Sequence, residues 1–115
     1  MEQTYFGPTQ KAVTYLNRAL ALPATGAEQD WELELADPNK LTLMVELLDS
    51  NTLDEETRSA LVVLILHSMQ QAYDDGADVS ATVRSVRTEI RTDAALRTQM
   101  ISYWARYDPV LAVLT

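Results

Sequence analysis

Few side chains in this sequence could act as catalysts, because it contains one histidine and no cysteine. His67 directly follows the apolar run "ALVVLIL" at residues 60–66. No cysteine can serve as a nucleophile beside it, and no second histidine can complete a metal triad. We therefore expect His67 to be a helix residue at the edge of the core and expect no catalytic residue. A small helical enzyme using His67 with a carboxylate is the weaker alternative.

Three carboxylates surround a glycine in "YDDGAD" at residues 73–78, a composition that suggests a calcium loop. An EF-hand loop requires a bidentate Glu six residues after the glycine, whereas residue 82 is Thr. A helix that ends with Gly76 in the left-handed conformation explains the same residues. The chain has three glycines, too few for a phosphate-binding or dinucleotide-binding loop. We predict neither a metal nor a cofactor.

Acidic residues are concentrated in one part of the chain. Residues 28–56 contain ten acidic residues and one Lys, a net charge of −9, whereas residues 79–107 contain five Arg and two acidic residues, a net charge of +3. The segment "EQDWELELADPNK" at residues 28–40 places five carboxylates around Trp31. Carboxylates attract a basic protein, and an aromatic side chain can form the desolvated centre of an interface. The predicted partner-binding residues are Asp30, Trp31, Glu32, Glu34, Asp37, Glu46, Asp49, Glu55 and Glu56.

Two other interpretations of the acidic residues remain open. Asp and Glu accumulate at helix starts, where the helix dipole favours negative charge, and this accounts for Asp37 and for the acids at 54–56 but not easily for those around Trp31. Alternatively, the arginines at positions 84, 87 and 91 lie across the acids and neutralise them within the domain. The binding interpretation requires the carboxylates to face outward together, without such internal pairing.

The composition restricts the class of protein. A chain of 115 residues with 47% apolar content is expected to form one domain, residues 1–115, with its own core. Its net charge of −8 opposes direct binding to nucleic acid or anionic lipid. The absence of cysteine, of an N-terminal signal and of an apolar run near the ~20 residues that span a bilayer leads us to expect a cytoplasmic protein.

The spacing of apolar residues, and the glycines and prolines between them, predict an all-α fold: a compact bundle of five to six helices. Because residues 60–66 are all apolar, a helix at about 54–75 would be apolar on every side there. This helix is therefore predicted to be central and covered by the others. In "DWELELAD" Trp31, Leu33 and Leu35 alternate with glutamates as in a strand, but no second strand could pair with it, so a short helix is expected. The other expected helices cover residues 9–22 and 38–49, a segment that begins at Asp78 or Ser80 and includes Ile90, and residues 93–107, followed by a terminal turn from 108.

Small size, acidity, absence of cysteine and helicity make the whole chain similar to bacterial immunity proteins, which neutralise toxins by covering them, and to some phage-encoded inhibitors that imitate nucleic-acid charge. The likeness implies a non-catalytic, cytoplasmic bacterial protein that occludes a basic toxin or effector protein. It transfers no individual residues.

The alternative function is a structural or homo-oligomerising module, with a possible homodimer. It would pair through an apolar stripe at 79, 83, 86 and 90 or through the aromatic residues at 103, 104 and 107. Core packing is the expected use of both groups, because helix faces this apolar are needed to cover the central helix.

Overall fold

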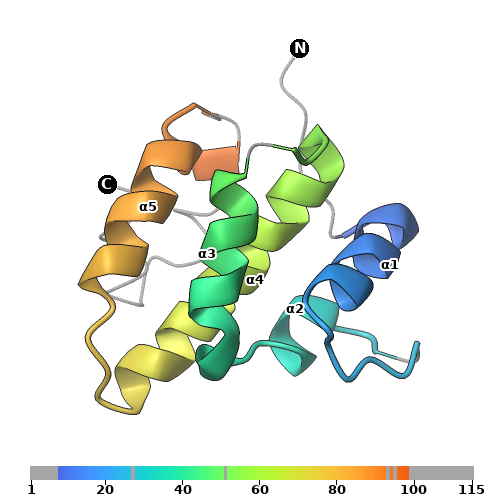
Figure 1. The fold of residues 1–115 in the computed structure, drawn as a ribbon, viewed down its shortest axis with the longest axis horizontal. Helices are drawn as coiled ribbons and strands as arrows, with labels where there is room; N and C mark the ends of the chain where they lie inside the picture. Colours follow the sequence, from blue (N-terminus) through green and yellow to red (C-terminus); the bar gives the residue numbers. More distant parts are fainter. Residues whose placement is uncertain (1–7, 27, 51, 93, 95, 99–115) are drawn as a thin grey trace.

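The computed structural model describes residues 8–98, apart from residues 27, 51, 93 and 95. This part of the chain contains helices and no strand, so the predicted all-α fold is confirmed. The helices, shown in Figure 1, are α1 (Gln10–Ala19), α2 (Trp31–Glu34), the 3₁₀ helix η1 (Pro38–Lys40), α3 (Leu41–Asp49), α4 (Glu55–Asp74) and α5 (Ser80–Ile90). None of the helices in the described residues is both long enough and apolar enough to cross a membrane.

Helix α4 is the centre of the bundle, as predicted. Every residue from 60 to 69 is buried, and α1, α2, α3 and α5 all contact this helix. It begins where predicted, because the Asp54 carboxylate accepts a hydrogen bond from the backbone N–H of Thr57 at 2.8 Å. It ends before Gly76, which has φ +88°, the left-handed conformation that was predicted.

Leu16 and Leu20 are buried where α1 packs on α4, and Thr9 caps the start of the helix, because its hydroxyl accepts a hydrogen bond from the N–H of Ala12. The helix ends at Ala19, with Leu20 as its C-cap, rather than near residue 22. The ammonium group of Lys40 donates to the carbonyl oxygens of Leu20 and Ala21, each at 2.8 Å, and satisfies carbonyls that the end of the helix leaves free. The helix end itself is closed locally, because Ala21 has φ +51° and the N–H groups of Ala21 and Leu22 donate back to the carbonyls of Arg18 and Asn17.

The alternating segment forms one turn of helix, α2, as expected from its lack of a strand partner. The N–H of Leu35 donates to the carbonyl of Trp31, and both side chains are buried, because residues four apart lie on one side of a helix. Leu33 lies on the other side and is 53% exposed. The alternation therefore separates a buried side from an exposed side of a single helical turn.

Helices α3 and α4 are antiparallel, and the residues between them lie at one end of the bundle (Figure 1). Helix α5 contacts both α3 and α4. Val79, Val86 and Ile90 are buried and Val83 is partly buried, so this stripe packs chiefly in the core of the chain rather than forming an exposed face. Of the helix expected at 93–107, only residues 94 and 96–98 are described, with Leu96 buried, and the aromatic residues at 103, 104 and 107 lie outside the described residues.

Candidate functional site

No group of three or more His, Cys, Asp or Glu side chains in the described residues could hold a metal ion. Within "YDDGAD", Asp78 Oδ1 accepts hydrogen bonds from the N–H and the hydroxyl of Ser80, at 2.9 and 2.6 Å. These hydrogen bonds, with a smaller contribution from the charge of Arg84, lower the pKa of Asp78. The segment is therefore the end of α4 followed by the start of α5, rather than an ion-binding loop.

His67 is 7% exposed and lies on α4, more deeply buried than the core edge expected for it. Burial lowers its pKa, because an apolar environment disfavours the imidazolium form, while the negative charge of Asp30 raises it by a smaller amount. The net effect favours a neutral imidazole in the core. The adjacent Ser68 hydroxyl accepts a hydrogen bond from the N–H of Asp37 at 2.9 Å, so this part of α4 is in contact with the end of α2 and the start of η1.

The prediction that Trp31 anchors a partner is corrected by its burial. The side chain is 4% exposed, and its indole N–H donates to Asn17 Oδ1 on α1 at 2.8 Å. The ring belongs to the core between α2 and the neighbouring helices, so it is not exposed as an interface anchor in this structure. The side chain that α2 exposes is Leu33.

The predicted acidic residues form two groups rather than one patch. We call Asp30, Glu32, Glu34 and Asp37 the α2 group, and Glu46, Asp49, Glu55 and Glu56 the α3–α4 group. The α2 group lies beside residues 67 and 68 of α4, as the Asp37–Ser68 hydrogen bond and the effect of Asp30 on His67 indicate.

Residues 55 and 67 are separated by about 18 Å along the α4 axis, at 1.5 Å per residue. The connection between α3 and α4 lies at one end of the bundle and α2 lies toward the other (Figure 1). The expectation of a single outward-facing acidic surface is therefore corrected to two separate groups of carboxylates.

Carboxylates in and next to the α2 group bind the local backbone. Glu34 Oε2 accepts from the N–H of Asp30 at 2.9 Å, and Asp37 Oδ1 accepts from the N–H of Asn39 at 2.9 Å. Glu28 accepts from the N–H groups of Thr25 and Gly26, at 2.9 and 3.3 Å. Hydrogen bonding to turns and helix starts therefore explains the positions of Glu28 and Glu34. This role was not expected from the sequence for the acids around Trp31.

Two side chains at the start of α4 bind α1. Asp54 Oδ2 lies 2.7 Å from Lys11 Nζ, and Glu56 Oε2 accepts from the Thr9 hydroxyl at 3.2 Å. Hydrogen bonds from Lys11 and then from Thr57 lower the pKa of Asp54, because they stabilise its charged form. These contacts hold the first turns of α1 and α4 together and assign Asp54 and Glu56 a role within the fold.

Glu46 and Asp49 differ from these acids. Both are exposed on the last turns of α3, and no other described side chain forms a hydrogen bond or ion pair with either of them. The last turn of α3 contains no basic residue. Leu43, one turn earlier, is 45% exposed. The exposed face of α3 thus combines one apolar side chain with two unbonded carboxylates.

Sequence reasoning missed Leu43. In the segment expected to be helical at 38–49, Leu41, Met44, Val45 and Leu48 recur at helical spacing and form one apolar face. Leu43 falls outside that spacing, so the sequence already indicated that its side chain is exposed.

Arg84 and Arg91 of α5 do not neutralise the α3 carboxylates by forming direct ion pairs with them. Both side chains are exposed, and within the described residues neither forms an ion pair with a carboxylate of the two acidic groups. The charge of Arg84 acts on Asp78, which belongs to neither group. Arg87 is partly buried on the same helix.

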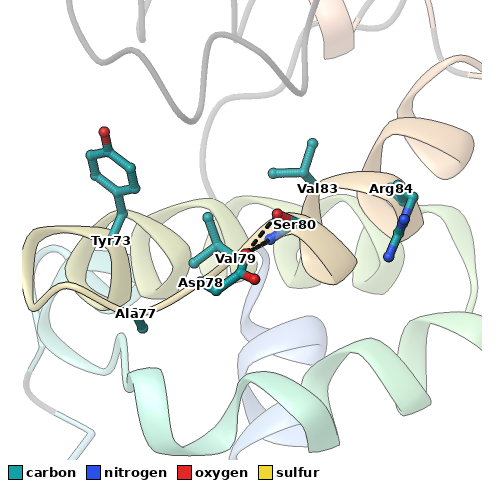
Figure 2. A pocket seen from close by; sticks show the side chains of 7 residues that line it. All are labelled: Tyr73, Ala77, Asp78, Val79, Ser80, Val83 and Arg84. Carbon is teal, nitrogen blue, oxygen red and sulfur yellow. Dashed lines mark hydrogen bonds between the residues drawn. The ribbon is translucent and has the colours of Figure 1, made fainter.

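A pocket of about 340 Å³ lies where α4 ends and α5 begins. Its lining, shown in Figure 2, is made of Tyr73, Ala77, Asp78, Val79, Ser80, Val83 and Arg84. The Tyr73 ring and the Val83 side chain point in the same direction in Figure 2, whereas the Arg84 guanidinium points away from them. The Tyr73 hydroxyl and the Arg84 guanidinium of this pocket therefore do not point toward one position.

The described residues define an all-α bundle that carries two separate groups of acidic residues. Comparison of the chain with protein-family models, with curated proteins and with solved structures gives no match. The functional conclusion therefore depends on the residues and their geometry.

Proposed function

We propose that this protein is a non-catalytic acidic binding protein that occludes a basic toxin or effector protein in the bacterial cytoplasm, with the exposed face of α3 as the principal contact. The main support is that Glu46 and Asp49 are exposed on the last turns of α3 and form no hydrogen bond or ion pair with any other described side chain. Binding by occlusion requires no catalytic group, metal or cofactor in this chain.

The position of these two carboxylates is unfavourable for the folded chain itself. The end of a helix carries partial negative charge on its free carbonyls, so acidic residues there reduce stability, by roughly 0.3–1 kcal/mol each at exposed sites. Glu46 and Asp49 are also three residues apart on one helix, where like charges repel by roughly 0.2–0.5 kcal/mol. Asp37 and Asp54, in contrast, cap helix starts. Residues that oppose stability are expected where binding requires them.

The chemistry of the α3 face indicates the partner. Leu43 offers an apolar contact, Glu46 lies beside it one turn later, and Asp49 lies beside Glu46 further round the exposed surface of the helix. A complementary surface would place an apolar side chain against Leu43 and Lys or Arg against the two carboxylates. The α2 group fits such a partner less well, because Glu34 and Asp37 already accept backbone hydrogen bonds.

The test is affinity capture from the native lysate, followed by a binding measurement on the purified partner. The variant Glu46→Lys/Asp49→Lys changes the proposed contact. The matched control is Asp74→Lys/Asp75→Lys, because these two exposed acids lie at the end of another helix and the change in net charge is the same. We expect the wild type and the control to retain a basic protein that the α3 variant loses.

Each other outcome contradicts part of the proposal. Equal loss of binding in both variants would show that net charge alone attracts the partner, without a contact on α3. Equal retention in both would exclude the α3 face. If the wild type captured no basic protein under conditions in which it is folded, the proposed function itself would be wrong.

A further inference from the structure

We draw no further inference here: the strongest candidate, the pocket of about 340 Å³ between the end of α4 and the first turn of α5, has apolar walls together with one arginine and one carboxylate of opposite charge, and nothing in the described part of the chain shows what covers it.

Discussion

The ammonium group of Lys11 lies 2.7 Å from the carboxylate of Asp54 and links the first turn of α1 to the residue that caps α4. The pKa of Asp54 lies below its usual value of 3.8, so the folded state favours the charged form. A carboxyl group of this kind stabilises the fold above its unfolded pKa, and the contribution is lost progressively as the pH falls below that value toward the folded pKa.

We predict that Asp54→Asn lowers the melting temperature near pH 6 and that the difference from wild type decreases below about pH 4. Thermal unfolding measured from pH 2 to pH 7 checks this. Glu55→Gln is the control, because Glu55 is exposed at the same helix start and does not contact Lys11. A difference between wild type and Asp54→Asn that stayed constant across the pH range would contradict the charged cap.

The buried Trp31 leads to a second prediction. Trp31→Phe keeps an aromatic ring but removes the donor to Asn17, and we expect a loss of about 1–3 kcal/mol, because a partly buried acceptor loses its partner. Trp31→Ala should cost about 3–5 kcal/mol, because it also removes the packed ring. Urea unfolding measures both. Affinity for a partner should be the same for Trp31→Phe as for wild type, and a large loss of affinity without a loss of stability would restore Trp31 as an interface residue.

The burial of His67 predicts a dependence of stability on pH. Its pKa is lowered in the fold, chiefly by burial, so below about pH 6.5 the unfolded chain binds a proton more readily than the folded chain. The free energy of unfolding should therefore fall between pH 7 and pH 5. The decline should be steeper in Asp30→Asn, which removes the charge that favours the imidazolium form, and it should be reduced in His67→Gln. An equal decline in all three proteins would exclude this histidine as the cause.

The α3 carboxylates should limit the stability of the free protein. Glu46→Gln/Asp49→Asn removes two negative charges from the end of the helix, and we expect a gain of roughly 0.5–2 kcal/mol in the free energy of unfolding. Removal of an acid at a helix start should have the opposite effect. Asp37→Ala should lower the free energy of unfolding by about 0.5–2 kcal/mol, because the helix loses its N-cap acceptor. Chemical denaturation without a partner gives both values. A loss of stability in the α3 double variant would contradict the view that these charges oppose the fold.

Leu33 and Leu43, the large exposed leucines among the described residues, provide a matched pair for testing the contact. Leu43→Ser and Leu33→Ser each change one exposed leucine in an acidic setting, and each should alter stability by less than about 0.5 kcal/mol. Leu43→Ser should speed dissociation of the captured partner, whereas Leu33→Ser should leave it unchanged. Surface plasmon resonance distinguishes them. The reverse pattern would move the contact to α2.

Helix positions were predictable because their signals are local. Thr9, Asp54 and Gly76 are start or stop residues whose side chains or backbone angles act within one turn, and the apolar run at 60–66 required a helix covered on every side. The short helix at α2 was predictable from the absence of a second strand. The end of α1 was not, because it depends on Ala21 at φ +51°, a left-handed conformation that alanine rarely adopts and that the sequence does not signal.

The candidate site was less predictable than the fold because its geometry depends on packing. Acids on both sides of Trp31 suggested an exposed ring, but a single helical turn can bury either side, and the position of α4 determines which side is covered. Counting charges along the chain also merged two groups that the antiparallel arrangement of α3 and α4 separates. Only the exposure of Leu43 could be recognised from local spacing.

Lys40 is the one base among residues 28–56, and its ammonium hydrogens are directed at main-chain oxygens at the end of α1. It is therefore not available to Glu46 or Asp49. No other described side chain pairs with these two carboxylates. A guanidinium or ammonium group from another molecule would therefore compete for them with water and dissolved ions. The association rate of such a partner should fall as the ionic strength rises, because dissolved ions screen the attraction between exposed charges.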